Sequence, residues 1–249
     1  MQHGNRIKVV RGIHIRVQKE YKNSMLFGGI YGSTAIGRDT EFSDIEMMYV
    51  LQPGTAERAK TFLYQGVPIE INFVPLDQAE RRLEELTLQV PFFMGNLANL
   101  QLLVGDNKLR DDILTKYQQL PQEQIARFFL DHGSEIAYES FNKIRSIPRR
   151  ANKRERELFV FEVIQEISLA IALLNRKPIT RGYYTGVKET FEFENVPDNY
   201  KELVEVLLKA TDVKDTIEAG HNLIDAYEKY LSEQGIRIRN VDTLDELDW

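Results

Sequence analysis

Residues 32–46 decide the fold of this chain, and they read GSTAIGRDTEFSDIE. An apolar run over residues 25–31 precedes the stretch and a second one, over 45–51, overlaps its end, so each run predicts a buried strand. A tight Gly-Ser turn and a polar loop join the two strands. Because side chains alternate along a strand, Asp44 and Glu46 share one face and lie close enough to share one hard cation.

The turn itself suits a phosphate group. Gly32 and Ser33 can present backbone N–H groups and a hydroxyl to phosphate oxygens, as glycine-lined nests do. Further along, the residues 61–75 predict a hairpin around Gly66 that ends in a strand over 69–74, on which Glu70 is placed to supply a third carboxylate. Carboxylates beside a phosphate-binding turn indicate Mg²⁺-assisted phosphoryl or nucleotidyl transfer.

Each piece also has an ordinary interpretation. A Gly-Ser turn alone is a common loop, and an Asp-x-Glu alone is usually a strand with one solvated face. The order strand, Gly-Ser, loop and acidic strand is what favours the catalytic interpretation.

The rest of the chain is largely helical. Apolar periodicity predicts a first helix over residues 6–22, and beyond Asp77 it predicts helices over 77–88, 106–118, 121–147, 158–175, 185–192, 198–210 and 213–234. Strands therefore crowd into the first third. We expect an α/β (α+β) domain with a small mixed sheet over residues 1–120, followed by an all-α helical bundle over 121–249.

Composition narrows the function classes for the 249-residue chain. It has 38 acidic against 32 basic residues, a formal charge of −6, which argues against a diffuse nucleic-acid binder and favours a cationic ligand. It has no cysteine, so thiolate chemistry is excluded. No apolar run is long enough to predict a membrane span and the first residues form no secretory signal, so we expect a cytoplasmic protein without membrane or nucleic-acid partners.

Two charged segments are explained by structure alone and predict no function. The basic residues 148–156 predict a solvated connector or helix start, and the last residues, 242–249, form an acidic tail. The four histidines are scattered without ligand spacing, which argues against a zinc site.

The Gly32-Ser33 turn, the nine residues after it and the run Ser-Asp-Ile-Glu-Met-Met over 43–48 resemble the signature of the polymerase-β-like nucleotidyltransferases. The acidic pair Asp-x-Glu is similar to that of the kanamycin nucleotidyltransferase family of aminoglycoside 4′-O-nucleotidyltransferases. The resemblance continues in Ile69–Phe73 and in residues 135–143, and it covers about residues 26–145. Where the family commonly has an arginine three residues after the serine, this chain has Ile36, and we expect Arg38 to take that place.

The resemblance implies a reaction and a set of roles. A nucleoside monophosphate would move from ATP or another nucleoside triphosphate to the 4′-hydroxyl of an aminoglycoside such as kanamycin or tobramycin, with release of pyrophosphate. The implied roles are Mg²⁺ binding by Asp44 and Glu46, triphosphate binding by Gly32, Ser33 and Arg38, α-phosphate binding by Lys143, general base catalysis by Glu139, and binding of acceptor ammonium groups by Glu70 and Glu135. It also implies a homodimer with shared active sites.

The residues of the helical domain allow two interpretations on their own. Glu135, Glu139 and Lys143 follow each other at four-residue steps, so we expect them to line one stripe of a helix. The stripe is either a solvated surface with a Glu139–Lys143 ion pair or, as the resemblance implies, part of the active site.

Two rival functions stay open. One is a nucleotidyltransferase with another acceptor, such as a lincosamide or a protein side chain. The other is a non-catalytic binding module with this fold, such as an antitoxin. The presence of Asp44, Glu46 and a candidate base argues against this second function.

Overall fold

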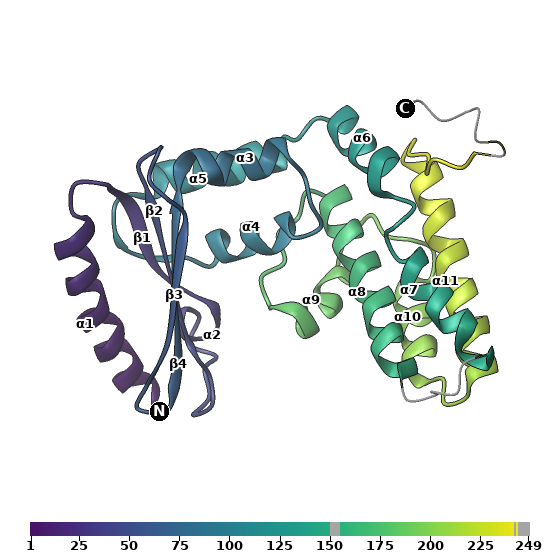
Figure 1. The fold of residues 1–249 in the computed structure, drawn as a ribbon, viewed down its shortest axis with the longest axis horizontal. Coiled ribbons are helices and arrows are strands. Elements are labelled where there is room, and N and C mark those ends of the chain that lie inside the picture. The colour runs from purple at the N-terminus through teal and green to yellow at the C-terminus, as the bar shows by residue number, and fades with distance from the viewer. Residues whose placement is uncertain (150–154, 242, 244–249) are drawn as a thin grey trace. The chain divides into compact units, whose positions relative to one another are not determined.

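The computed structural model describes residues 1–149, 155–241 and 243. It divides into two compact units, shown together in Figure 1 and treated separately below. Unit 1 comprises residues 1–120 together with Pro178–Gly182, and unit 2 comprises 121–177 and 183–249.

The short segment Pro178–Gly182 belongs to unit 1, although the domains predicted from the sequence, 1–120 and 121–249, place it in the helical domain. Ile179 donates its backbone N–H to the carbonyl oxygen of Pro91 at 2.9 Å, and Asn99 Nδ2 donates to the carbonyl oxygen of Thr180 at 2.7 Å. Gly95 makes this contact possible, because a Cβ there would come within 1.7 Å of the Ile179 carbonyl oxygen. No local pattern in the sequence predicts so distant a contact.

Unit 1 is a mixed sheet with helices. In chain order its elements are α1 (His3–Tyr21), β1 (Met25–Tyr31), α2 (Gly32–Ala35), β2 (Ile45–Leu51), β3 (Arg58–Tyr64), β4 (Val67–Pro75), α3 (Leu76–Glu84), α4 (Val90–Ala98), β5 (Gln101–Val104) and α5 (Asn107–Gln118). The strand order is β3-β4-β2-β1-β5, with β2 parallel to β4 and every other pair antiparallel. The predicted small mixed sheet is confirmed.

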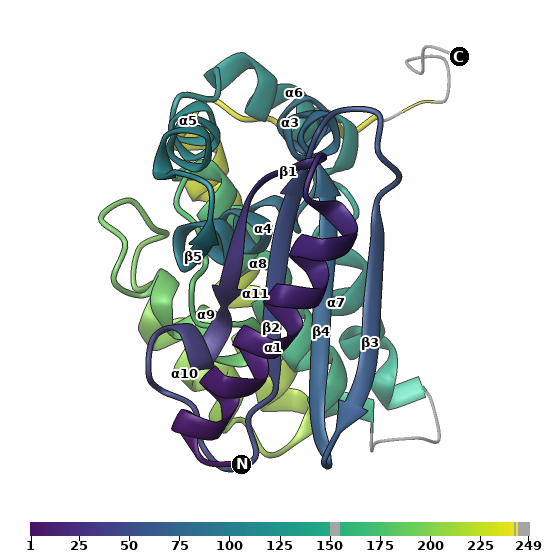
Figure 2. The ribbon, with the colours of Figure 1, turned by 90° about the vertical axis from the view of Figure 1, so that its left-hand side faces the viewer.

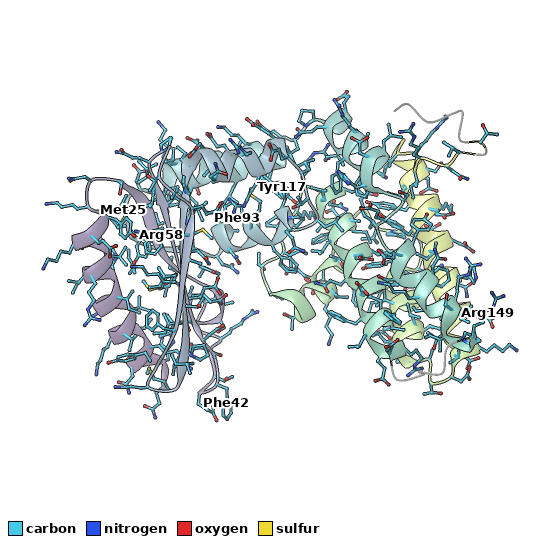
Figure 3. The ribbon with its side chains drawn as sticks, viewed as in Figure 1. Met25, Phe42, Arg58, Phe93, Tyr117 and Arg149 are labelled. Atoms are coloured by element: carbon cyan, nitrogen blue, oxygen red, sulfur yellow. The ribbon has the colours of Figure 1, made fainter. Side chains whose placement is uncertain are left out.

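One face of this sheet holds the core of the unit. Alternate residues of β2 and β4, including Ile45, Met47, Ile69 and Ile71, pack against the buried stripe of α1, which lies across the sheet in Figure 2. At the exposed edge strand β3, Arg58, labelled in Figure 3, places its guanidinium 4.9 Å from the ring centroid of Tyr21 and so covers this core from outside. Burial of this apolar surface stabilises the fold by roughly 25 cal/mol per Å² removed from water. Because the apolar residues must face α1, the residues between them point to the opposite face of the sheet.

The opposite face carries the residues of alternate parity, among them Glu46 and Glu70. Figure 1 shows α3, α4 and α5 on this side of the sheet. Because α3 follows directly on the carboxyl end of β4, these helices leave the amino ends of β2 and β4 accessible, where the acidic residues lie.

Three elements of unit 1 were not predicted. The polar loop after Gly32 begins with the four-residue helix α2, and α4 and β5 follow α3 where the sequence predicts no element. Helix α4 contains Pro91 and Gly95 and is apolar around most of its surface, so it shows no 3.6-residue period. Strand β5 spans four residues at the sheet edge, too short for an alternating pattern.

Unit 2 is helical, as predicted. Its elements are α6 (Gln122–His132), α7 (Tyr138–Ser146), the 3₁₀ turn η1 (Ile147–Arg149), α8 (Arg156–Leu174), α9 (Tyr183–Thr190), α10 (Tyr200–Lys209) and α11 (Val213–Glu233). Helix α8 is the central one: residues 167–174 are all buried, and it packs against α7, α9, α10 and α11.

The prediction of a continuous helix over 121–147 is wrong. Residues 133–137 form a turn between α6 and α7, and Ala137 adopts the left-handed conformation with φ of 65°. Gly133, the first residue of the turn, follows α6 directly and still has a helical backbone conformation, with φ of −62°. Glu135 therefore lies in a turn, and the predicted helical stripe of Glu135, Glu139 and Lys143 loses its first member.

Among the described residues, no helix is long and apolar enough to cross a membrane. Residues 150–154 of the basic connector and, apart from Thr243, the acidic tail 242–249 lie outside the described residues.

Candidate active site

A row of polar side chains crosses four strands of the sheet in unit 1. Strand register pairs Tyr31 of β1 with Glu46 of β2, Glu46 with Glu70 of β4, and Glu70 with Thr61 of β3. Paired residues of neighbouring strands share a face, so these four side chains point to the same side. Asp44, two residues before Glu46, lies on that side at the edge of the row. The structure thus brings together the three carboxylates of Asp44, Glu46 and Glu70.

Gly32 lies directly against this row. It begins α2 with φ of 68°, and a Cβ at this position would come within 1.8 Å of Glu46 Oε2. Glycine is required here both by the backbone conformation and by the closeness of the carboxylate. Ser33 follows, and its carbonyl oxygen accepts a hydrogen bond of 2.9 Å from the backbone N–H of Arg38. This bond closes the turn and leaves the Arg38 side chain exposed beside it.

Burial and crowding of negative charge perturb Glu46. Removal from water raises the pKa of its carboxyl from 4.5 to about 7, and the charges of Asp44 and, to a lesser extent, Glu70 add to this shift. A bound cation would relieve the repulsion. The site therefore has unbalanced negative charge that favours a positive partner.

This shift predicts a dependence of stability on pH. Because the folded state binds the Glu46 proton more tightly than the unfolded state, metal-free protein should lose stability as pH rises from 4.5 to about 7. The variant Glu46→Gln lacks this titration, so at pH 8 its free energy of unfolding should exceed that of the wild type by up to about 3 kcal/mol.

Urea unfolding of both proteins between pH 4 and pH 8 measures the difference. The exposed Glu41, changed to Gln, is the control and should give a nearly constant difference. A Glu46→Gln difference that stays constant over the same range would contradict a strongly raised pKa.

Asn72 holds Glu70 in place and links it to Tyr31. Asn72 Nδ2 donates to Glu70 Oε1 at 2.5 Å and to the hydroxyl oxygen of Tyr31 at 2.9 Å. Burial, together with Glu46 and Glu70, raises the pKa of Tyr31 well above its usual value, so the phenol stays protonated. Neither Asn72 nor Tyr31 was assigned a role from the sequence. The signal for Tyr31 was available, because it immediately precedes the Gly-Ser turn.

The residues present fit a magnesium ion. No group of three or more histidine or acidic side chains suited to a metal ion is found within the described ranges, so unit 1 offers Asp44 and Glu46 as a pair. Mg²⁺ typically binds one or two protein carboxylates and completes its shell with water and substrate phosphates. Because Gly32 has no Cβ, the Glu46 carboxylate can lie directly against the start of the Gly-Ser turn.

A pocket of about 330 Å³ lies beside the acids. Its lining residues are Asp44, Thr61, Phe62, Leu63, Pro68, Ile69 and Glu70. Its wall combines the carboxylates of Asp44 and Glu70 with apolar residues of β3 and β4, and it is large enough for part of a small acceptor molecule.

In unit 2 the structure brings together Glu139 and Lys143. Lys143 Nζ lies 3.0 Å from Glu139 Oε1, one helical turn apart on α7. The Glu139 side chain is 73% exposed, and its hydrogen bond to Lys143 is the main cause of a raised lysine pKa. An exposed pair of this kind contributes little to stability, so it is available for exchange with a ligand.

Sequence reasoning missed Glu166 of α8. Glu166 Oε2 accepts a hydrogen bond of 2.8 Å from the backbone N–H of Ala137, the left-handed residue just before α7. Burial raises the pKa of this carboxyl. Glu166 thereby caps the helix that carries Glu139 and Lys143. Its position within a strongly apolar helix gave no sequence signal for this role.

The predicted site residues thus form two groups. Gly32, Ser33, Arg38, Asp44, Glu46 and Glu70 belong to unit 1, whereas Glu135, Glu139 and Lys143 belong to unit 2.

Comparison with known proteins supports a family assignment. Residues 107–237, slightly more than half of the chain, match the family described as KNTase C-terminal domain. One similar solved structure is a nucleotidyltransferase-like protein from Exiguobacterium sibiricum 255-15, with 11% identity over 90% of this chain and 79% of that chain and a TM-score of 0.49. No curated protein matches. The family match includes α7 with its glutamate–lysine pair, and the chain belongs to the KNTase C-terminal domain family of nucleotidyltransferases.

Proposed function

We propose that the protein transfers a nucleoside monophosphate from ATP or another nucleoside triphosphate to the 4′-hydroxyl of an aminoglycoside. The observation that carries the proposal is the alignment of Asp44, Glu46 and Glu70 on one sheet face directly against the glycine of a Gly-Ser turn. The family match over residues 107–237 supports the reaction class. The aminoglycoside and its 4′-position rest on the resemblance of the motifs.

In this proposal Asp44 and Glu46 hold Mg²⁺. When bound, the ion stabilises the negative charge that develops on the triphosphate during transfer. Both carboxylates must be ionised to bind it, and the raised pKa of Glu46 means that proton release accompanies binding near neutral pH. Gly32 lets the Glu46 carboxylate lie against the Gly-Ser turn, and Ser33 and Arg38 bind the β- and γ-phosphates.

Proton transfer and charge neutralisation fall to α7. Glu139 takes the proton from the acceptor hydroxyl while that oxygen forms its bond to the α-phosphorus and pyrophosphate leaves. Lys143 neutralises the α-phosphate. The 3.0 Å ion pair between the two residues supports these roles, because it places the carboxylate and the ammonium group side by side on α7.

The acceptor is proposed to bind through its ammonium groups. Glu70 lines the 330 Å³ pocket and is oriented by Asn72, while Glu135 lies exposed in the turn before α7. The formal charge of −6 favours approach of a polycation. We further propose a homodimer, which the family resemblance implies.

Two alternatives differ in what they would bind. A lincosamide or a protein side chain as acceptor would suit the apolar wall of the pocket formed by Leu63 and Pro68. A non-catalytic module would not need a half-buried, charge-crowded carboxylate such as Glu46, whose presence favours an enzyme.

The acceptor proposal predicts a dependence on salt. If Glu70 and Glu135 bind ammonium groups, the dissociation constant for kanamycin or tobramycin should rise several-fold between about 0.05 and 0.5 M NaCl, because salt screens exposed charge pairs. Lincomycin, which carries far less positive charge, should be a poor substrate. Calorimetric titration over a salt series and pyrophosphate release with each acceptor test both points. Salt-independent binding of aminoglycosides, or faster turnover of lincomycin, would contradict the acidic acceptor site.

A further inference from the structure

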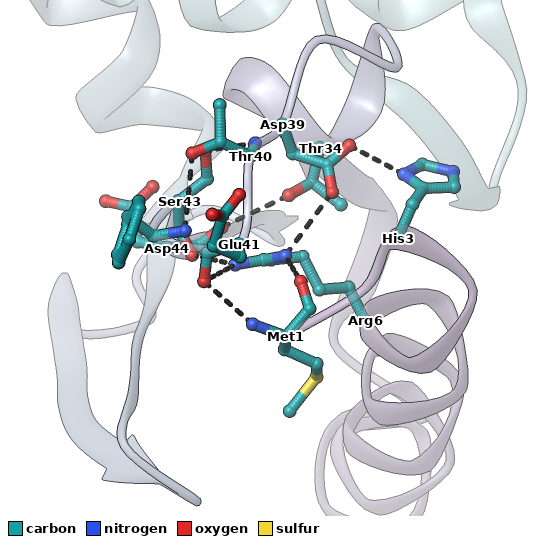
Figure 4. A network of polar contacts seen from close by, with 10 residues as sticks. Met1, His3, Arg6, Thr34, Asp39, Thr40, Glu41, Ser43 and Asp44 are labelled. Atoms are coloured by element: carbon teal, nitrogen blue, oxygen red, sulfur yellow. Dashed lines mark hydrogen bonds and ion pairs between the residues drawn. The ribbon is translucent and has the colours of Figure 1, made fainter.

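The loop over residues 36–44, between the Gly-Ser turn and the acidic pair, is held by a buried arginine of α1. Arg6 is 0% exposed and donates to the backbone carbonyl oxygens of Glu41, at 3.2 Å, and Ser43. It also donates to the carbonyl oxygen of Met1 and to the Asp39 carboxylate, at 3.5 Å. Figure 4 shows the guanidinium at the centre of this network.

A guanidinium in this position is costly. Removing a charge from water is unfavourable unless it is paired and fully hydrogen-bonded, and Arg6 Nε has no partner. The counterion is Asp39, whose side chain is also buried, with 2% of it exposed. Its Oδ1 lies 2.6 Å from His3 Nδ1. An apolar residue would fill the same space at lower cost, but only a guanidinium supplies a rigid fork of donors for several carbonyl groups at once.

The contacts converge on the backbone at Asp44. Arg6 holds the carbonyl oxygen of Ser43, which belongs to the peptide group before the Asp44 Cα. Thr34, buried at 2% exposure, donates its hydroxyl to the carbonyl oxygen of Asp44 at 3.1 Å, which belongs to the peptide group after it. Both peptide groups that flank the Asp44 Cα are therefore fixed, although the Asp44 side chain itself is exposed.

We propose that Arg6 and Thr34 are positioning residues for divalent-cation binding by Asp44. By fixing the two flanking peptide groups they leave only the side-chain torsions of Asp44 to be ordered when a cation binds. Less ordering on binding means tighter binding, as for other residues that orient metal ligands. The inference rests on the proposed function, since it takes Asp44 as a metal ligand.

The test measures Mn²⁺ binding by the protein alone, from the loss of the electron paramagnetic resonance signal of the free ion. Thr34→Val keeps the shape of the side chain but removes the hydroxyl, and it should weaken Mn²⁺ binding about tenfold. Arg6→Lys, which keeps the charge without the fork, should have an effect at least as large. Thr34→Ser, which keeps the hydroxyl, should bind like the wild type.

The matched control is Thr216→Val in unit 2. Thr216 is also fully buried, and its hydroxyl donates to the carbonyl oxygen of Asp212 at 2.6 Å, so the control loses a comparable buried hydrogen bond elsewhere. It should leave Mn²⁺ binding unchanged. Urea unfolding of each variant reports its stability separately, and Thr34→Val still tests the inference if Arg6→Lys does not fold.

The outcomes are distinguishable. Weaker binding by Thr34→Val and Arg6→Lys, with Thr34→Ser and Thr216→Val unchanged, supports the inference. If the wild type binds Mn²⁺ through Asp44, so that Asp44→Asn abolishes binding, but Thr34→Val and Arg6→Lys bind normally, the inference is wrong and the proposed function stands. If Asp44→Asn binds as tightly as the wild type, Asp44 is no metal ligand and both are wrong.

Discussion

Changing Asp44 to asparagine is expected to lower kcat by about a thousandfold or more while the protein stays folded. Metal stabilisation of transition-state charge contributes several kcal/mol, and each 1.36 kcal/mol corresponds to a factor of ten in rate. The side chain of Asp44 is exposed and its fold contact is made by the backbone carbonyl group, which the substitution keeps. The substitution should therefore change stability by no more than about 0.5 kcal/mol.

Steady-state kinetics at saturating Mg²⁺, with urea unfolding of the same samples, checks this expectation. Glu41→Gln serves as the control, because it removes an exposed carboxylate three residues earlier in the same loop. The control should keep nearly full activity. Turnover by Asp44→Asn within a few-fold of the wild type would remove the acidic pair from the mechanism.

The second large effect tests whether the residues of the two groups act in one active site, as the family resemblance implies. The family resemblance implies a homodimer in which unit 2 of one subunit completes unit 1 of the other. Mixing inactive Asp44→Asn protein with inactive Glu139→Gln protein, under conditions that allow subunit exchange, should then restore activity. Random exchange makes about half of the dimers mixed, and each mixed dimer has one intact site, so about a quarter of wild-type activity should return.

The matched control mixes Asp44→Asn with Glu46→Gln. Both changes lie in unit 1, so every site keeps one defect however the subunits pair, and no activity should return. Native mass spectrometry confirms that exchange has occurred. Exchange without recovery in the Asp44→Asn and Glu139→Gln mixture would place Glu139 in the site of its own subunit or outside catalysis.

Local patterns were sufficient to predict the strands that carry the acidic residues. Strands β1 and β2 are short apolar runs bounded by turn residues, and β3 and β4 flank Gly66, which has φ of 78°. Strand alternation then turned Glu46 and Glu70 to one face, as their register shows. These features depend on neighbouring residues, which is why a single sequence predicts them.

Features that depend on distant contacts could not be predicted in this way. The turn at residues 133–137 interrupts a helical pattern at a point where Ala137 is left-handed and donates its backbone N–H to Glu166, 29 residues away. Arg6 occupies one position on an otherwise apolar stripe of α1, where a long charged side chain usually reaches solvent. Only the fold shows that it reaches the loop before Asp44.

The central claim is that a nucleoside monophosphate is transferred to an aminoglycoside, and mass spectrometry of the acceptor tests it most directly. Kanamycin and tobramycin would each be incubated with the protein, ATP and Mg²⁺, with Asp44→Asn protein as the control. We predict that the antibiotic gains the mass of one adenosine monophosphate residue with the wild-type protein only. If the antibiotic stays unmodified, the account is contradicted. This holds whether the nucleotide is found on a lincosamide, is found on protein, or is not transferred at all.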